Sequence, residues 1–137
     1  MREIRRAGPE HYTVLMGLVE KLFSKAPCPY PLSQALRALS NALVPNPLSA
    51  VFLAFEDGTP VGYVWVEALD NGTAWVHHAY SERVWVGRAL LEELIRFAKS
   101  RGCHKLGGIT HRDSSFVKAM IRRYGARLEG YLLSREV

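Results

Sequence analysis

The chain has 137 residues, of which 48% are hydrophobic and 23% charged, and this balance excludes a disordered or fibrous protein. A chain of this length supports one hydrophobic core, so we expect a single domain over residues 1–137, with no leader peptide, no membrane partner and a cytoplasmic location. The net charge of +5 is uneven, because residues 1–82 carry −2 and residues 83–137 carry +7, and this favours an anionic ligand for the second half.

The first part of the chain predicts a short strand and two helices. Residues 4–6 suit an edge strand, and Pro9 suits the first position of a helix. Apolar residues then recur at helical spacing over residues 14–23, and a second helical pattern covers residues 32–43. Prolines interrupt the chain after each pattern. We expect the loop between the helices, together with the second helix, to contact substrate.

The middle of the chain predicts three strands in succession. Apolar strand patterns cover residues 50–56, 61–69 and 74–80. The dipeptides Asp57-Gly58 and Asn71-Gly72 separate them, and both are signals for tight hairpins. These strands are therefore expected to pair antiparallel.

The last part alternates between helix and strand. A helix is expected to follow a turn at Gly87 and to end near Arg101. A strand over residues 105–110, a helix over 116–125 and a strand over 127–135 complete the pattern. A final strand, helix and strand imply one parallel crossover, so the expected fold class is α/β with a mixed sheet.

The turn at Gly87 predicts an anion site. Backbone N–H groups at the start of a helix have no partner inside the helix, and the helix dipole adds positive potential there, so a phosphate group is a suitable ligand. The two cysteines, Cys28 and Cys103, are not in zinc-ligand spacing, and the histidines do not recur at helical i, i+4 spacing. We therefore expect no metal site.

The segment VWVGRALLEELIRFAKSRG and the order of elements resemble the GNAT family of N-acetyltransferases. The family signature is Arg or Gln, two residues, Gly, one residue, and then Gly or Ala. It aligns here with Val84, Trp85, Val86, Gly87, Arg88 and Ala89. The two small residues match. Val84 replaces the basic first residue, with Arg83 one position early and Arg88 inside the motif as the nearest cations.

The resemblance implies a central mixed, mostly antiparallel sheet of about six strands flanked by four helices. It implies acetyl-CoA as the co-substrate, with its pyrophosphate on backbone N–H groups of the Val84–Ala89 motif and no metal ion. The strand residues Ala79 and Tyr80 are implied to hold the pantetheine arm and the acetyl carbonyl. In the following helix, Ser114 takes the place of an asparagine of the family.

The resemblance also directs attention to an acid and a base. Ile121 stands where family members carry a tyrosine that protonates the departing CoA thiolate, and Tyr124 is the nearest candidate to replace it. Candidates for the base lie on or after the preceding strands, and they are Glu67, Asp70, His77 and His78. Because adjacent strand residues face opposite sides, we expect at most one of the two histidines to reach a common cleft.

These features predict an N-acetyltransferase that moves an acetyl group from acetyl-CoA to a primary amine of a small molecule or peptide, by direct attack in a ternary complex. The changed motif and the missing tyrosine leave a second hypothesis, a catalytically impaired module that binds CoA or another protein. Nucleic-acid binding through the basic half is a third hypothesis, which we do not favour. The sequence leaves a homodimer open.

Overall fold

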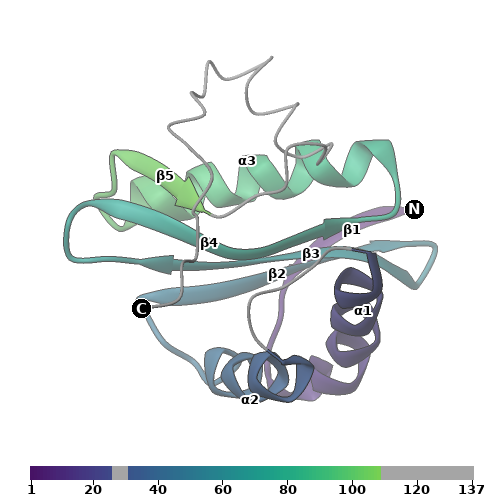
Figure 1. The fold of residues 1–137 in the computed structure, drawn as a ribbon. Helices are drawn as coiled ribbons and strands as arrows, with labels where there is room; N and C mark the ends of the chain where they lie inside the picture. Colours follow the sequence, from purple (N-terminus) through teal and green to yellow (C-terminus); the bar gives the residue numbers. More distant parts are fainter. Residues whose placement is uncertain (26–30, 109–137) are drawn as a thin grey trace.

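The computed structural model describes residues 1–25 and 31–108 (Figure 1). The elements follow in the order β1 (Arg2–Arg6), the 3₁₀ helix η1 (Pro9–His11), α1 (Tyr12–Lys25), α2 (Leu32–Ala42), β2 (Ser49–Glu56), β3 (Thr59–Ala68), β4 (Thr73–Ser81), α3 (Val84–Ser100) and β5 (Lys105–Gly108). This order agrees with the prediction as far as residue 108. The helix and strand predicted over residues 116–125 and 127–135 lie outside the described residues.

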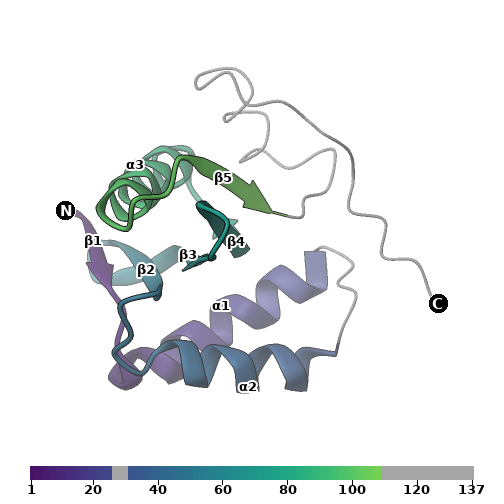
Figure 2. The same ribbon diagram turned by 90° about the vertical axis from the view of Figure 1, so that its left-hand side faces the viewer.

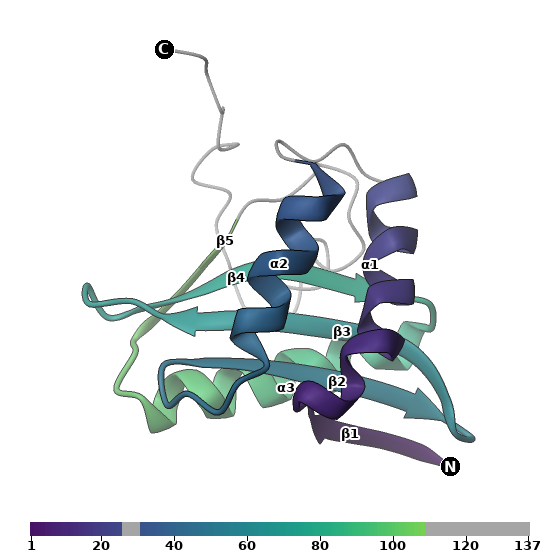
Figure 3. The same ribbon diagram turned by 90° about the horizontal axis from the view of Figure 1, so that it is seen from below.

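The described strands form one sheet in the order β1-β2-β3-β4-β5. The pairs from β1 to β4 are antiparallel, and β4 pairs with β5 in parallel, so the predicted mixed, mostly antiparallel sheet is confirmed. Helix α3 covers one face of the sheet, and α1 and α2 cover the other (Figures 1 and 2). Seen from below, α1 and α2 run side by side across the strands (Figure 3). Within the described residues, no helix is both long enough and apolar enough to span a bilayer.

The two faces of the sheet bury separate apolar layers because side chains alternate along each strand. In β2, Phe52 and Ala54 pack in the layer beneath α3, whereas Val51 and Leu53 pack against α1 and α2. A strand covered on both faces is expected to be apolar throughout, which explains the continuous apolar run in β2. Helix α3 contributes a stripe of buried residues to its layer, namely Val86, Leu90, Leu91, Leu94, Phe97 and Ala98.

The predicted hairpins are confirmed by their backbone geometry. Asp57 and Gly58 have φ angles of 50° and 82°, which is the positive-φ pair that a two-residue hairpin needs. In the second hairpin Gly72 has φ of 80°, and the side chain of Asn71 accepts a hydrogen bond of 3.1 Å from the backbone N–H of Thr73. These local signals position β3 and β4 next to each other.

One local prediction was wrong, because Gly87 does not lie in a turn before the helix. Helix α3 already begins at Val84, and Gly87 belongs to its first turn. The reason is the packing of Val86, which is fully buried and whose Cγ1 lies 2.5 Å from where a Cβ on Gly62 would be. Since Gly62 has no side chain, the first turn of α3 packs directly on the first half of β3.

Candidate functional site

A β-bulge in β4 shapes the centre of the site. Trp65 of β3 pairs with His78, whereas the next residue, Val66, pairs with Val76. His77 is therefore an extra residue in β4 with no partner in the register. A bulge of this kind interrupts the ladder and leaves the extra residue unpaired.

The bulge places both histidines on the same face of the sheet, which corrects the expectation that at most one of them reaches a common cleft. The His77 ring stacks on Trp65 with centroids 4.5 Å apart, and the His78 ring meets the same indole edge-on at 5.1 Å. Trp65 belongs to the layer beneath α1 and α2. Side chains normally alternate between the two faces of a strand, but the extra residue at the bulge leaves two successive side chains on the same face.

His77 forms an ion-pair geometry with Glu67. Its Nε2 lies 2.8 Å from Glu67 Oε1, and the two side chains are 28% and 44% exposed, so solvent or a ligand can reach both. An ionised carboxylate only accepts hydrogen bonds, so the hydrogen of a neutral His77 ring belongs on Nε2. Nδ1 then keeps its lone pair, which is the state that a proton acceptor needs.

His78 has a different environment. The residue is 5% exposed, its Nδ1 lies 3.0 Å from the hydroxyl of Tyr63, and its ring contacts Phe23 edge-on at 5.9 Å. Burial, with a smaller effect from neighbouring His77, lowers the pKa of His78 to about 4. His78 is therefore a neutral, buried ring near neutral pH.

Tyr80 links the end of β4 to helix α1. Its hydroxyl donates to Glu82 Oε2 at 2.8 Å and accepts from Lys25 Nζ at 3.2 Å, while Lys21 Nζ lies 3.1 Å from the same Glu82 oxygen. Burial, together with the hydrogen bond to Glu82, raises the pKa of Tyr80. Burial opposes ionisation of Glu82, but the hydrogen bonds from Tyr80 and Lys21 outweigh it and lower the pKa of this carboxyl. Ala79, between His78 and Tyr80, packs instead in the layer beneath α3.

The start of α3 lies directly after β4, and its aromatic and basic side chains are held by one carboxylate. Glu56 accepts hydrogen bonds of 3.0 Å from both Arg83 Nε and Trp85 Nε1. The guanidinium of Arg2 lies over the Trp85 ring at 5.1 Å. Arg83, the cation next to the first motif position, is therefore already paired, and Val84 is fully exposed beside it.

The rest of the motif leaves open space at the first turn of α3. A Cβ added at Gly87 would meet only Ser81 Oγ, at 4.0 Å. Arg88 is exposed and has no ion-pair partner among residues 1–25 and 31–108, and Ala89 is half-buried. Small residues, backbone N–H groups at a helix start and a nearby cation are a donor set that fits a pyrophosphate.

Most of the predicted residues form two groups within the described part of the chain, whereas Asp70 is exposed in the turn between β3 and β4 and Ala79 packs beneath α3. Glu67, His77, His78 and Tyr80 lie on the α1/α2 face of β3 and β4. The residues Val84–Ala89 lie at the start of α3, where β4 ends. Ser114 and Tyr124 lie outside the described residues. No group of three potential metal ligands occurs among the residues that the structure describes.

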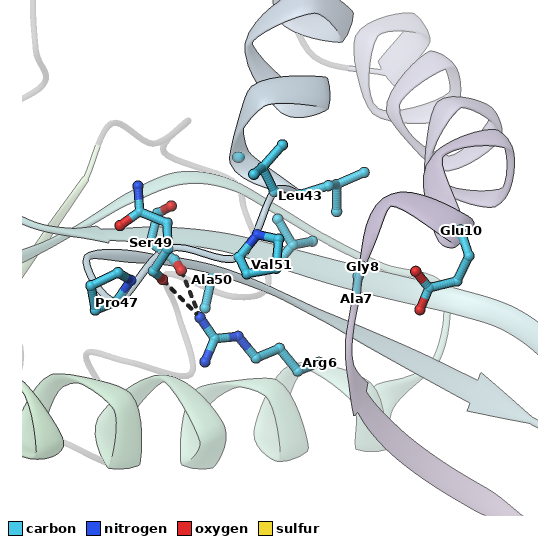
Figure 4. A pocket seen from close by; sticks show the side chains of 13 residues that line it. Arg6, Ala7, Gly8, Glu10, Leu43, Pro47, Ser49, Ala50 and Val51 are labelled. Atoms are coloured by element: carbon cyan, nitrogen blue, oxygen red, sulfur yellow. Dashed lines mark hydrogen bonds between the residues drawn. The ribbon is translucent and has the colours of Figure 1, made fainter.

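A separate cavity of about 550 Å³ lies between the end of β1 and the loop from α2 to β2 (Figure 4). Arg6 donates hydrogen bonds of 3.0 and 2.9 Å to the carbonyl oxygens of Asn46 and Ser49 at its rim. None of the predicted site residues lines this cavity. Of its charged lining residues, Arg6 is bound to backbone carbonyl oxygens and Glu10 belongs to no group of predicted site residues, so we do not take this cavity as the candidate site.

Sequence reasoning missed the partners of the site residues. Tyr63 and Trp65 contact His78 and His77, and Glu56 and Glu82 hold the side chains at the start of α3 and the end of β4. The alternation of β3 places Glu67 and Trp65 on one face, and this signal could have paired them with a histidine. No local signal marks the bulge itself.

The comparisons with known proteins agree with this geometry. The model of the acetyltransferase (GNAT) family matches residues 16–126. The aminoglycoside N-acetyltransferase AAC(6')-Iy, solved in complex with CoA, is similar in fold, with a TM-score of 0.75 and 17% identity over 99% of this chain and 95% of that one. A search of curated sequences finds no match.

Two further solved structures cover the full chain. A predicted acetyltransferase from Clostridium acetobutylicum, solved with acetyl-CoA, has a TM-score of 0.75 and 16% identity, over 100% of this chain and 96% of that one. A ribosomal-protein-alanine N-acetyltransferase from Brucella melitensis biovar Abortus 2308 has a TM-score of 0.73 and 16% identity, over 100% of both chains. At these identities the likeness concerns the fold.

Proposed function

Because the chain belongs to the GNAT family of acetyltransferases, we propose that it is an N-acetyltransferase that transfers the acetyl group of acetyl-CoA to a primary amine. One observation carries the proposal. A half-exposed imidazole, His77, is paired with the Glu67 carboxylate at a bulge of β4, and the same strand leads into the small-residue start of α3. A proton acceptor and an anion-binding helix start are the two elements that acetyl transfer from a phosphate-bearing thioester needs.

The start of α3 is the proposed site for the pyrophosphate of acetyl-CoA. The first backbone N–H groups of α3, Gly87 and Ala89 supply donors and close approach, and exposed Arg88 supplies positive charge. Acetyl-CoA supplies the acetyl group as a thioester. The interrupted ladder beside His78 and Ala79 supports the proposal that backbone donors there face the acetyl carbonyl.

His77 is the proposed base. Its Nε2–H donates to Glu67, so Nδ1 can accept the proton that the amine nitrogen loses as it bonds to the acetyl carbon. The carbon–sulfur bond breaks in the same reaction, and the sulfur leaves with the electron pair as the CoA thiolate. Glu67 holds the ring in this tautomer and stabilises the imidazolium that forms.

The other ionisable groups on this face are less suited to that role. Burial and a pKa of about 4 make His78 a poor base for an ammonium. Tyr80 already donates its proton to Glu82, and its raised pKa does not favour donation to a thiolate. Tyr124, which lies outside the described residues, stays the proposed acid.

A second candidate function is a module that binds CoA without transferring the acetyl group. Two observations favour it. Val84 is fully exposed at the position where the family has a basic residue, and the adjacent Arg83 is bound to Glu56. Weaker contacts to the phosphates leave less binding energy to orient the thioester.

Calorimetric titration with acetyl-CoA, followed by an assay of CoA-thiol release over a panel of primary amines, tests both functions. The double variant Gly87→Gln with Arg88→Glu should weaken binding about tenfold to a hundredfold, because a charge-assisted hydrogen bond contributes about 1.5–3 kcal/mol. Lys99→Glu, a charge reversal near the other end of α3, is the matched control. Binding without turnover favours the module, and no binding at millimolar ligand rejects both functions.

His77→Gln and Glu67→Gln test the proposed base separately from binding. Both should lower kcat about a hundredfold or more, the usual contribution of a general base, with little change in acetyl-CoA affinity. Unchanged kcat in both variants, measured at saturating amine, would show that the proton leaves by another route.

A further inference from the structure

The site contains a third partly exposed group on the face that carries Glu67 and His77, and this group is the indole of Trp75. Trp75 pairs with Glu67 across β3 and β4, and it precedes His77 by two residues on the same strand. Cross-strand partners and residues two apart point to the same face. Trp75, Glu67 and His77 therefore lie next to one another on the α1/α2 face.

The neighbouring strand is shaped to leave room for this ring. Gly107 of β5 is the parallel partner of Trp75. A Cβ at Gly107 would lie 3.3 Å from Trp75 Cε3 and 3.3 Å from Thr73 Cγ2. The indole thus lies against the backbone of β5, where a larger residue would push it away.

Trp75 is only half-buried, unlike Trp65 on the same face of the sheet, which is 8% exposed. Within residues 1–25 and 31–108, the indole N–H of Trp75 has no hydrogen-bond acceptor, and no aromatic ring contacts it. An accessible indole presents a flat apolar surface with a negative face, which attracts rings and cations. Among the described residues, Glu67 and His77 are the ionisable side chains next to Trp75 on this face of β3 and β4.

We propose that Trp75 is the stacking surface for the acceptor, and that the acceptor is a primary amine attached by a short linker to an aromatic ring. The inference rests on the proposed acetyltransferase function and names its substrate class. The Cα atoms of residues two apart on a strand are about 6.6 Å apart, so we expect a ring stacked on Trp75 to need a linker of about one to three carbon atoms for its amine to approach His77. The Glu67 carboxylate attracts the ammonium form of such an amine, which releases one proton to solvent before the neutral nitrogen attacks and passes its second proton to His77.

The flat surface distinguishes this class from amines on polyhydroxylated frames. Sugar hydroxyls need several polar partners when they leave water, and Glu67 and His77 already satisfy one another. An aromatic amine needs only a surface for its ring to stack on and one polar group near its nitrogen, and the described residues provide both. We therefore expect benzylamine, phenethylamine and phenylpropylamine to bind better than butylamine or glucosamine.

The test measures binding of amines to the CoA-loaded protein by calorimetric titration, and then turnover with acetyl-CoA. Wild type should bind phenethylamine about tenfold more tightly than butylamine, the factor expected from about 1.4 kcal/mol of stacking and burial. Trp75→Leu should remove this preference and raise KM for phenethylamine, with kcat at saturation little changed. Trp75→Phe should keep most of the preference for phenethylamine, and Gly107→Val should lose this preference because the valine side chain displaces the indole.

The control is Val44→Ala, an exposed apolar residue by the cavity at the end of α2, which should change neither value. Equal binding of phenethylamine and butylamine by wild type, tighter binding of glucosamine, or an unaltered preference in Trp75→Leu would overturn the inference. A preference for phenethylamine that depends on Trp75, but without acetyl transfer, would support Trp75 as the stacking surface and reject the proposed function. Acetyl transfer to amines that is unaffected by substitution of Trp75 would support the proposed function and reject the role of Trp75.

Discussion

The buried imidazole of His78 makes the stability of the protein depend on pH. The ring has an ordinary pKa of 6.5 when unfolded and a pKa of about 4 when folded, mainly because burial disfavours its charged form. Between these values the unfolded chain binds more protons than the folded one, so stability rises with pH. The contribution is fully present above pH 6.5 and is lost as the pH falls towards 4. Between pH 7.5 and pH 5 the loss amounts to about 2 kcal/mol.

Urea unfolding of wild type and His78→Gln at several pH values from 7.5 to 5 measures this contribution. Carboxyl groups also titrate in this range, so the quantity to follow is the difference between the two proteins. As the pH falls from 7.5 to 5, the free energy of unfolding of wild type should fall by about 2 kcal/mol relative to that of His78→Gln, because glutamine does not titrate. His104→Gln, which changes an exposed histidine, is the control. A difference between wild type and His78→Gln that stays constant from pH 7.5 to pH 5 would refute the argument.

Three further substitutions test the packing around the site. Leu94→Ala should lower the free energy of unfolding by about 2–5 kcal/mol, because Leu94 is fully buried on the side of α3 that faces the sheet; a smaller loss in urea melts would contradict this placement. Gly72→Ala should cost about 1–3 kcal/mol, since φ is 80° and the new Cβ would lie 2.5 Å from His104 Cε1; an unchanged melting temperature would refute it. Tyr63→Phe should cost about 1–3 kcal/mol by removing the hydroxyl that His78 contacts at 3.0 Å, and equal urea midpoints would show that this bond contributes nothing.

Local signals in the sequence were sufficient for most of the described fold. Asp57-Gly58 and Asn71-Gly72 predicted both hairpins because a positive φ is a property of the turn residues themselves. The helical spacing of apolar residues likewise predicted α1, α2 and α3. The start of α3 was misplaced, since the burial of Val86 against Gly62 is a contact between distant parts of the chain.

The candidate site was predicted in composition but not in arrangement. Glu67 and His77 were named as alternatives, and the structure joins them at 2.8 Å. Their pairing depends on the register of β3 against β4, which the residues of neither strand determine alone. The same holds for Glu56 and Glu82, whose partners lie on other elements and change the charge available at the start of α3.

The bulge at His77 explains how one short strand serves both a core and a polar site. Before it, Ala74 and Val76 face α3, and after it Ala79 does so. Without the extra residue, the alternation would continue and point His78 into the apolar layer beneath α3, where an imidazole has no partner. The insertion instead turns His78 towards the hydroxyl of Tyr63 and leaves His77 partly exposed beside Glu67. Two adjacent histidines thereby acquire different properties, one buried and neutral, the other accessible to solvent.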